Sequence, residues 1–484
     1  MADSGFNFDN TYIKLPKVFY TKLLPTPVYK PEMVIFNAPL ATDMGLDFSG
    51  VSTGVKAALF SGNNMPEGSQ PFAQAYAGHQ FGNFTVLGDG RAIVWGEHIT
   101  PSYQRLDIQF KGSGPTPYSR GADGRAVLGP MLREYIMSQA MHALNIPTTR
   151  SLAVVTNGEN VYREKALPGA ILTRIASSHI RVGTFEYAAL HQDKIIIQKL
   201  VDYTIERHYP WIKKGKNKPL LLVKSVIEKQ VDLIIHWMRV GFIHGVMNTD
   251  NMTLSGETID YGPCAFMDAY DSRTVFSSID HSGRYAYANQ PHIAQWNLAR
   301  LGEAILPLLH DECENAEETI EEALNDFGIL YEKKWLSMMR AKLGLFDNRE
   351  GDECLIMELL HWMQRAGADF TNTFLYLTED NIPQGKPYNN SFFKEWHTCW
   401  QMRLAKNNKS SQYSLNLMRA NNPSVIPRNH IMEQVLEDAT NGDLKPLNDF
   451  LTALETPYKN RPDLKPYQSP PKQEETVYQT FCGT

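Results

Sequence analysis

His244-Gly245-Val246-Met247-Asn248-Thr249-Asp250-Asn251 is the most informative stretch of this chain, and Asp260-Tyr261-Gly262 begins nine residues after its end. Asn251 and Asp260 carry the hard oxygen ligands that Mg²⁺ prefers, and few protein ligands are needed where phosphates and waters complete the coordination shell. Asp250, the one acid of the loop, could accept a proton from a hydroxyl or only add negative charge beside a metal. The alternative is an Asx turn at each position. The order of the residues favours a metal site.

The same spacing occurs in the catalytic loop of protein kinases, H-R-D-x-x-x-x-N, which precedes a D-x-G turn. His244 and Asn251 keep the separation of seven residues, but Val246 stands where a kinase has its catalytic aspartate. The pattern therefore indicates either a kinase that has lost its base or a working site whose chemistry differs from phosphorylation of a hydroxyl. In both cases we expect His244 to be a packed loop anchor.

A phosphate-binding lysine is predicted upstream of this loop. Residues 106–111 alternate apolar and polar side chains, so the apolar ones share one face of a strand and Lys111 points to the other with the remaining polar ones. Residues 130–146 repeat apolar side chains at helical spacing, and Glu134 lies in the first turns of that helix. Kinases pair a strand lysine with a helix glutamate. The alternatives are a solvated lysine at a strand edge and a surface glutamate.

Two further groups suit a bound triphosphate. The segment 87–91, Leu-Gly-Asp-Gly-Arg, could form a turn whose backbone N–H groups approach phosphates, although a G-x-G turn between strands is more often only a turn. Arginines could bind phosphates bidentately from the same part of the chain. They are Arg120, Arg125, Arg174 and Arg181, and Asp123-Gly124 lies in the loop between strand and helix.

These patterns predict an α+β fold of the protein-kinase-like, bilobal type, with a β-rich N-lobe that contains one main helix and a larger helical C-lobe. Strands are expected near 92–95, 151–155 and 170–175, and a long helix over 219–240. Ser255-Gly256-Glu257 is interpreted as a tight hairpin that delivers Asp260. The expected units are an irregular N-terminal wrap (1–75), the nucleotide-binding N-lobe (76–185), the C-lobe with both loops (186–455) and an extended, Pro-rich tail (456–484).

Composition limits the function classes. The 484 residues include 47 basic and 53 acidic side chains, a net charge of −6, which argues against a dedicated nucleic-acid binder. No apolar run approaches the length that spans a bilayer, and the N-terminus has no signal-peptide profile, so we expect a cytoplasmic protein without a membrane partner, and a monomer. The five cysteines are scattered and form no zinc pattern.

Seven segments resemble one family, selenoprotein O (SelO/YdiU), and together they cover nearly the whole chain. Four lie in the predicted N-lobe or just before it: Gln74-Ala75-Tyr76-Ala77-Gly78-His79-Gln80-Phe81-Gly82, Leu87-Gly88-Asp89-Gly90-Arg91-Ala92, Lys111-Gly112-Ser113-Gly114-Pro115-Thr116-Pro117-Tyr118-Ser119-Arg120 and Asp123-Gly124-Arg125-Ala126. The others are the His244 loop through Met252, Asp260-Tyr261-Gly262-Pro263 and Ile426-Pro427-Arg428-Asn429-His430.

The resemblance implies a kinase-like protein adenylyltransferase that binds ATP in an inverted orientation and transfers AMP to Ser, Thr or Tyr hydroxyls of protein substrates, with redox-related proteins as candidates. Some bacterial relatives use UTP with Mn²⁺. It also implies residue roles: Lys111 paired with Glu134; Gly88, Gly90, Arg91, Asp123, Gly124, Arg174, Arg181 and Asp260 on the nucleotide; Asp250 as proton acceptor; Asn251 and Asp260 as ligands of Mg²⁺ or Mn²⁺. Inversion would bury the γ-phosphate and require extra cations deep in the site, which explains the arginines.

The family's C-terminal cysteine can form a disulfide with a cysteine that follows the D-Y-G segment. Cys482 matches the tail position, but Phe276 stands at the partner position, which leaves Cys264 on a nearby loop as a substitute. Two other functions remain open. They are a divergent protein kinase, against which Val246 argues, and a non-catalytic nucleotide-binding pseudokinase.

Overall fold

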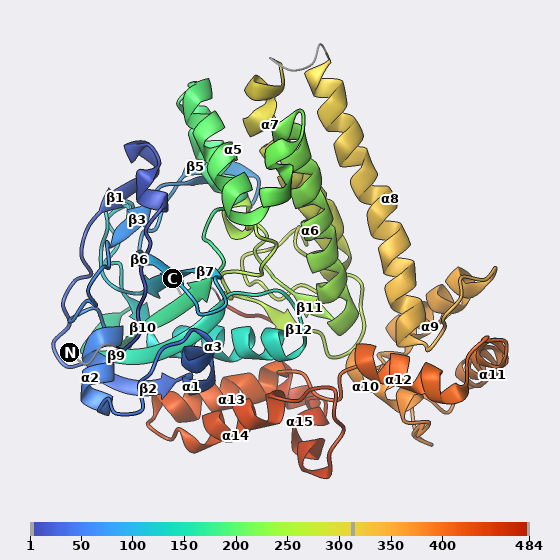
Figure 1. The fold of residues 1–484 in the computed structure, drawn as a ribbon. Helices are drawn as coiled ribbons and strands as arrows, with labels where there is room; N and C mark the ends of the chain where they lie inside the picture. Colours follow the sequence, from blue (N-terminus) through green and yellow to red (C-terminus); the bar gives the residue numbers. More distant parts are fainter. Residues whose placement is uncertain (1–3, 311–314, 482–484) are drawn as a thin grey trace.

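The computed structural model describes residues 4–310 and 315–481, with a β-rich N-terminal part beside a larger helical part (Figure 1). An eight-stranded sheet has the order β1-β3-β6-β7-β10-β9-β2, and β8 pairs with β10. Its paired strands all run antiparallel. Their bounds are β1 (Tyr20–Lys22), β2 (Glu32–Phe36), β3 (Phe72–Gln74), β6 (Ala92–Ile99), β7 (Arg105–Lys111), β8 (Ala126–Val127), β9 (Arg150–Tyr162) and β10 (Ala166–Ala176).

Strand β7 divides its side chains between two environments. Ile108 and Phe110 enter an apolar cluster that α1 (Ala38–Asp43) and α2 (Thr53–Phe60) help to cover. The alternate residues Asp107, Gln109 and Lys111 are also buried, but they face polar partners on the other side of the sheet. This arrangement confirms the alternation predicted for 106–111 and places a buried polar row in the N-terminal part.

Helix α3 (Leu128–Ala143) packs on β9 and β10 and is the main helix of the N-terminal part. Helices from the end of the chain cover its other side (Figure 1). Arg133 of α3 donates to Asn429 Oδ1 and Glu433 Oε1 of α13 (Asn429–Thr440), at 2.8 Å each. Because these bonds join residues about 300 apart in sequence, the C-terminal helices fix the position of α3 and therefore of Glu134.

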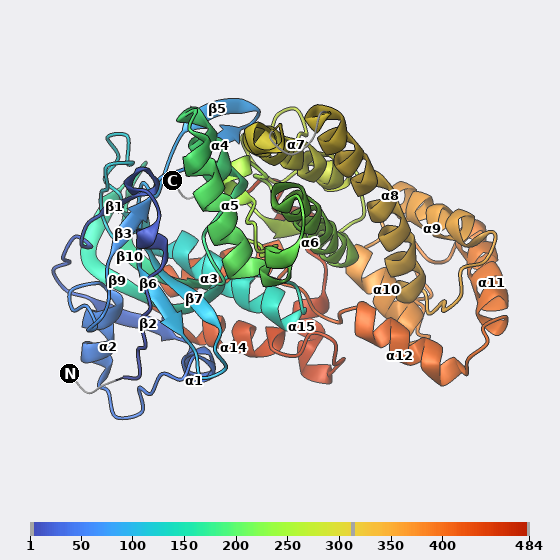
Figure 2. The ribbon, with the colours of Figure 1, turned by 45° about the horizontal axis from the view of Figure 1, so that its top comes forward.

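The helical part is built around α6, whose apolar stripe is buried and whose C-terminus ends at Gly241 with a φ of 74°. Helices α7 and α8 pack against it (Figure 2). The elements are α4 (Val182–Leu190), α5 (Lys194–His208), α6 (Lys218–Val240), β11 (Phe242–Ile243), β12 (Ala265–Phe266), α7 (Gln290–Leu309), α8 (Ala316–Lys342), α9 (Asp352–Ala366), α10 (Phe370–Thr378), α11 (Ser391–Ala405), α12 (Ser411–Asn421), α13 (Asn429–Thr440), α14 (Lys445–Leu454) and α15 (Lys465–Gln468).

A separate hairpin, β4 (Ala77–Gln80) with β5 (Asn83–Val86), is inserted between β3 and β6. It leaves the main sheet and reaches across to α4 and toward α7 (Figure 2). In chain order it occupies the place of the loop that covers the phosphates in a kinase. Through its contacts with α4, the hairpin links the N-terminal part to the helical part.

Most of the elements expected from periodicity are confirmed. The strands near 92–95, 151–155 and 170–175, the helix over 130–146 and the helix over 219–240 all form. The expectation that 1–75 is irregular is wrong, because β1, β2 and β3 join the main sheet. These strands are three to five residues long and pair with distant strands, so they leave no local periodicity.

The hairpin interpretation of the segment before Asp260 is also wrong. Thr253 and Thr258 form isolated bridges with Arg181 and Thr148 and do not pair with each other, although a turn at 254–255 is present. The tail 456–481 contains one short helix, α15, and short 3₁₀ turns. The division into four units stays a prediction.

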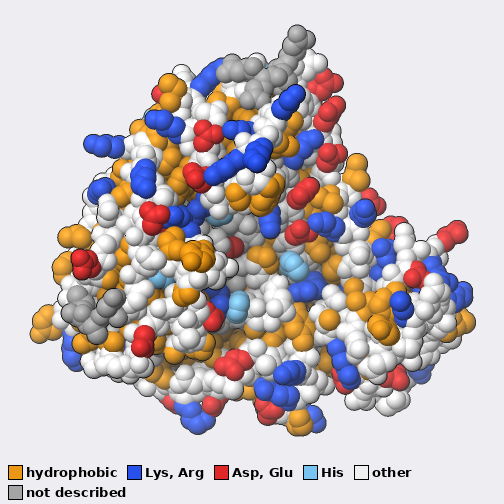
Figure 3. All heavy atoms as spheres, viewed as in Figure 1, with side chains coloured by type: hydrophobic (Ala, Val, Ile, Leu, Met, Phe, Trp, Pro, Cys, Tyr) orange, Lys and Arg blue, Asp and Glu red, His pale blue; other side chains and the backbone are white. Residues whose placement is uncertain are grey.

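Charged side chains of both signs are interspersed over the face seen in Figure 3. This distribution agrees with the nearly balanced composition and lacks the one-sided basic field that nucleic-acid binders show. Among the described residues, no helix has the combination of length and apolarity that crossing a membrane requires.

Candidate functional site

A pocket of about 360 Å³ opens between the two parts. Such a volume lies within the range of small-molecule sites. Every nucleotide-binding, metal-binding and catalytic residue predicted from the sequence lines it: Gly88, Gly90, Arg91, Lys111, Asp123, Gly124, Glu134, Arg174, Arg181, Asp250, Asn251 and Asp260. Arg120 and Arg125 line it as well. The structure thus brings these residues together, while their roles stay predictions.

The centre of the pocket is a buried ion network. Lys111 Nζ at the end of β7 lies 2.7 Å from Glu134 Oε2 on α3 and 2.9 Å from Asp260 Oδ1. Arg174, from β10, donates to Glu134 Oε1 through Nε at 2.8 Å and to Asp260 Oδ1 at 2.7 Å. Two cations therefore share the same two carboxylates. The lysine–glutamate pair has the geometry of an active kinase N-lobe.

Arg181 extends this network to the catalytic loop. Its guanidinium donates to the backbone oxygen of Asp250 at 3.0 Å and to Asp260 Oδ2 at 3.3 Å. The ring of Tyr76 lies over the guanidinium, 4.3 Å from its centre, in a cation–π arrangement. Asp89 lies on the same side, with Oδ1 3.8 Å from Arg181. Both arginines are almost fully buried, so their charge is directed into the pocket rather than toward solvent.

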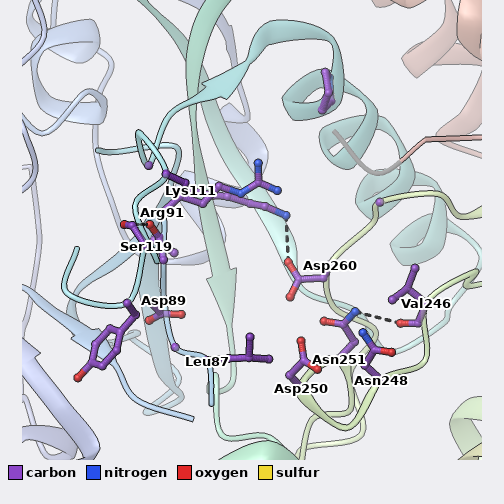
Figure 4. A pocket seen from close by; sticks show the side chains of 18 of the residues that line it. Leu87, Asp89, Arg91, Lys111, Ser119, Val246, Asn248, Asp250, Asn251 and Asp260 are labelled. Atoms are coloured by element: carbon purple, nitrogen blue, oxygen red, sulfur yellow. Dashed lines mark hydrogen bonds and ion pairs between the residues drawn. The ribbon is translucent and has the colours of Figure 1, made fainter. Parts of the chain in front are cut away.

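Asp250 and Asn251 lie on a short 3₁₀ turn, η4 (Thr249–Asn251). Asn251 Nδ2 donates to the backbone oxygen of Val246 at 2.9 Å, which leaves its amide oxygen available to a ligand. Asp250, Asn251 and Asp260 point toward the same space, with Lys111 on its far side (Figure 4). Asp250 Oδ1 is buried and has no hydrogen-bond partner among the described residues. A buried carboxylate oxygen without a partner is costly and is characteristic of functional sites.

His244 is a structural anchor, as the sequence predicted. Its ring is fully buried, and Nε2 lies 2.8 Å from the backbone oxygen of Ile259. Burial lowers the pKa of His244, which keeps the imidazole neutral near pH 7. The hydrogen bond joins the catalytic loop to the chain just before Asp260. Asp260 itself has a φ of 60°, an uncommon conformation for a residue other than glycine.

The pocket carboxylates differ in their titration. Burial alone would raise the pKa of Asp260, but Arg174, Lys111 and Arg181 hold it well below its usual range. Burial raises the pKa of Asp89 to about 6 and the pKa of Asp250 to about 6, because Arg181 offsets only part of the desolvation at each. Asp260 is therefore a fixed anion, whereas Asp250 has a pKa suited to proton transfer near neutral pH.

The donor set fits a hard divalent cation that is shared with phosphates. Among residues 4–310 and 315–481, no cluster of three or more His, Cys, Asp or Glu side chains could hold a metal ion by itself. The pocket instead offers one amide oxygen, from Asn251, and one carboxylate, from Asp260, with the unpartnered Asp250 oxygen nearby. Mg²⁺ is commonly bound through one or two protein ligands plus substrate phosphates.

The Gly-rich turn differs from the expected phosphate cradle. The amides of Asp89 and Gly90 already donate to backbone oxygens of Gln74 and Gly88, at 2.9 and 2.7 Å. Gly88 has a φ of 147°, and a Cβ there would overlap the ring of Tyr118. The glycines thus allow Tyr118 to pack against the turn, and two of the amides that a phosphate would need are in use.

The remaining predicted residues lie at the mouth of the pocket. Asp123 forms an ion pair with Arg163, 2.9 Å apart, and both side chains are partly exposed. Gly124 has a φ of 64°, and a Cβ there would overlap Gly114, so glycine is required by both conformation and packing. A contact between this rim and a nucleotide stays a prediction.

Two pocket residues that lie against Arg181 carry no role in the sequence-based prediction. Tyr76 covers Arg181, and Asp89 brings a second carboxylate whose pKa is raised. Both lie in segments that resemble the family, yet neither residue type indicates a functional role by itself. A tyrosine before a hairpin and an aspartate in a G-x-G turn each have ordinary structural explanations.

The disulfide suggested by the resemblance involves Cys482, which lies outside the described residues. The tail just before it is held by hydrogen bonds, one of which the Thr480 amide donates to Phe276 O at 2.7 Å. Thr480 Oγ1 also donates to the backbone oxygen of Pro263. Cys264 is fully buried, and burial raises the pKa of its thiol to about 12, which makes it a poor nucleophile at neutral pH.

The lysine–glutamate pair, the catalytic loop and the D-x-G turn, set between a β-rich part and a helical part, define a protein of the protein-kinase-like class. The family model described as "Protein adenylyltransferase SelO" matches residues 4–455, so the chain belongs to the SelO family. A "Protein nucleotidyltransferase YdiU" of Nitrosococcus oceani is 58% identical over 483 residues, covering 100% of this chain and 98% of that protein. Proteins with the same name from Bacillus thuringiensis and Alcanivorax borkumensis are 56% and 55% identical over 481 residues, covering 99% of each chain.

Proposed function

We propose that this protein transfers AMP from ATP, bound in an inverted orientation, to hydroxyl groups of protein substrates and releases pyrophosphate. One observation carries the proposal. The only loop acid, Asp250, lies beside Asn251 in a pocket whose buried end holds Arg174 and Arg181. A γ-phosphate bound by these arginines would leave the α-phosphate closest to the catalytic loop.

In the proposed reaction the acceptor hydroxyl forms a new O–P bond at the α-phosphorus, and the bond from that phosphorus to the bridging oxygen breaks. Asp250 takes the hydroxyl proton, which its raised pKa favours. Lys111, Arg174 and Arg181 stabilise the negative charge that develops on the departing pyrophosphate. Val246 supplies no proton acceptor at the position that a kinase uses.

Asn251 and Asp260 are proposed to hold Mg²⁺ or Mn²⁺. The bound cation would neutralise phosphate charge and orient the nucleotide, as divalent ions do in phosphoryl transfer. Asp260 is suited to this role because three cations keep it ionised. Its contacts with Lys111 and Arg174 also link the proposed metal ligand to the proposed phosphate-binding side chains.

Labelled ATP tests the proposal. Incubation of the protein with a mixture of acceptor proteins should give protein-bound label from α-³²P-ATP and none from γ-³²P-ATP. Protein-bound label from γ-³²P-ATP and none from α-³²P-ATP would indicate a divergent kinase. Metal-dependent nucleotide binding with no label on any protein, itself included, would indicate a non-catalytic pseudokinase. A parallel reaction with α-labelled UTP and Mn²⁺ distinguishes UMP transfer, and Asp260→Ala should abolish labelling in every arm.

A further inference from the structure

The hairpin β4–β5 contacts the catalytic loop through its β4 edge. The Leu87 amide donates to Tyr76 O, which makes these two residues a hydrogen-bonded pair at the base of the hairpin. Alternation along an antiparallel ladder then directs the amides of residues 77 and 79 away from β5. The amide of His79 accordingly donates to Thr249 Oγ1 at 2.7 Å.

A second hydrogen bond lies at the tip of the hairpin. The Phe81 amide donates to Asn248 Oδ1 at 3.0 Å, and the hydroxyl of Tyr285 donates to the same oxygen at 2.6 Å. Asn248 and Thr249 are the two residues that precede Asp250. The hairpin therefore binds the loop directly before Asp250, the proposed base.

Close backbone approach brings the hairpin against Asp250 itself. A Cβ on Gly78 would overlap Asp250 Oδ1, and a Cβ on Gly183 of α4 would overlap the backbone oxygen of Ala77. Gly78 has an ordinary backbone conformation, so its lack of a side chain serves this approach rather than a turn. Glycines at both positions let the hairpin lie directly between α4 and Asp250.

A partly buried contact between an imidazole and a carboxylate holds the hairpin to α4. His79 Nδ1 lies 2.5 Å from Glu186 Oε1, and the Glu186 side chain is only 5% exposed. The rings of Phe84 and Trp296 pack edge-on against the imidazole, with centroids 5.1 and 5.2 Å away. Burial raises the pKa of Glu186, and the Thr249 hydroxyl and the His79 ring oppose that rise. The pair thus spans the hairpin, α4 and the loop before Asp250.

From these contacts we infer that the β4–β5 hairpin is the positioning element of the base, with Gly78 and His79 as its positioning residues. Asp250 Oδ1 has no hydrogen-bond partner among the described residues, so hydrogen bonds to that oxygen do not set its direction. The wall formed by Gly78 sets it, and the His79–Glu186 pair holds that wall in place. This inference rests on the proposed function, in which Asp250 accepts the hydroxyl proton.

Gly78→Ala is the first test, with Thr85→Ala as the matched control. Thr85 faces Gly78 across the hairpin and does not lie against Asp250. The added methyl group should displace the Asp250 carboxylate and lower kcat about 10- to 100-fold, since an ångström of misplacement has effects of that order. KM for the nucleotide and its Kd should change less than about twofold, because the Lys111 network is untouched. Thr85→Ala should keep the wild-type kcat.

His79→Ala and His79→Gln form the second test, because the glutamine can still donate to Glu186. We expect His79→Ala to lower kcat and His79→Gln to restore most of it, at unchanged nucleotide Kd. Equal kcat for Gly78→Ala and wild type would overturn the inference, as would kcat and Kd changing in proportion in both series. If wild-type protein transfers no α-label, the proposed function fails. If it does and the variants match it, only the inference fails.

Discussion

The two ends of the polar face of β7 carry two buried charge clusters with opposite properties. At one end, Asp107 Oδ1 accepts from Arg207 at 2.6 Å and Oδ2 from the His179 amide at 2.9 Å. Glu97 on β6 also binds Arg207, at 2.6 Å, and accepts from the amide of Thr11 at 2.7 Å. This rear cluster, Glu97, Asp107, His179 and Arg207, has both carboxylates satisfied by the protein.

At the other end, the pocket cluster of Lys111, Glu134, Arg174, Arg181 and Asp260 adjoins two carboxylates that are not satisfied. Asp89 Oδ1 and Asp250 Oδ1 are buried and have no hydrogen-bond partner in the described chain. The same strand thus supports one cluster whose carboxylates are paired within the protein and one that adjoins carboxylate oxygens without a partner. Unpartnered buried charge lowers stability and is characteristic of functional sites. The difference agrees with the proposed location of the reaction in the pocket.

Asp250→Asn gives the largest expected effect at the pocket end. Without a proton acceptor, kcat for AMP transfer should fall about 10²- to 10⁴-fold, while nucleotide Kd stays close to that of wild type. The free energy of unfolding at neutral pH should rise, because a buried carboxylate whose pKa is about 6 is replaced by a neutral group. Single-turnover transfer assays and thermal denaturation measure the two effects. A variant that loses stability as well as activity would contradict the contrast.

Asp107→Asn tests the rear end and should act in the opposite direction. Removing the Asp107 carboxylate leaves Arg207 with Glu97 as its carboxylate partner, and losing one charge-assisted hydrogen bond should make unfolding easier by about 1.5–3 kcal/mol. The nucleotide Kd of the folded variant should remain near the wild-type value. Denaturant titration with nucleotide binding on the same samples checks both statements, and a loss of binding in fully folded protein would argue against two separate roles.

The pH dependence of the rear cluster follows from the pKa of Asp107. Burial raises this pKa, but Arg207 and His179 lower it to about 2, below its unfolded value of 3.8. The resulting stabilisation, about 2 kcal/mol, is fully present above pH 4 and is lost as pH falls toward 2. Asp107→Asn should therefore differ most from wild type above pH 4, and the two proteins should converge in acid. A constant difference across that range would refute the assignment.

Asp89→Asn should stabilise the protein by about 1–3 kcal/mol at pH 7.5. Burial raises the pKa of Asp89 from 3.8 to about 6. Between these two pH values the folded state keeps a proton that the unfolded chain has lost. Wild-type stability consequently falls as pH rises from 4 to 6, and the variant lacks this loss. Thermal melts at pH 4 and 7.5 should show little difference at the lower pH and a higher Tm for the variant at the upper one.

Arg163→Ala gives the smallest expected effect and serves as a control for both clusters. The Arg163–Asp123 pair lies at the pocket mouth with both side chains partly exposed. Exposed ion pairs contribute less than about 1 kcal/mol, so the stability change should be close to zero and should shrink further with added salt. Denaturation at low and high ionic strength measures it. A large loss of stability would mean that the Arg163–Asp123 pair at the pocket mouth is coupled to the pocket cluster.

Local patterns predicted the parts of this molecule that obey a period or a spacing. The alternation ending at Lys111, the helix bearing Glu134 and the loop ending at Asn251 were all predictable, because each pattern lies within a few residues. The strands within 1–75 were not, since their pairing is long-range. His79 and Glu186 lie 107 residues apart, and no local pattern links them. The cation–π contact between Tyr76 and Arg181 was also unpredictable, because stacking depends on tertiary geometry alone.

The charge distribution within the pocket was also beyond local patterns. The sequence places acids and arginines in one region, but only the folded structure sets three cations around Asp260, which keep it ionised, and buries Asp89 and Asp250 with too little positive charge to offset the rise in their pKa values. The contrast between the rear cluster and the pocket cluster is therefore a property of the folded chain.

The most direct test of the central claim is the mass of the group that an acceptor protein gains from ATP. Mass spectrometry of the modified residue, with wild-type enzyme and Asp250→Asn compared at equal nucleotide occupancy, identifies the phosphorus that is attacked. Wild-type enzyme should give an adenosine monophosphate adduct on a hydroxyl side chain with one pyrophosphate released per adduct, and the variant should give almost no adduct. A phosphate adduct, or equal modification by both proteins, would contradict the central claim.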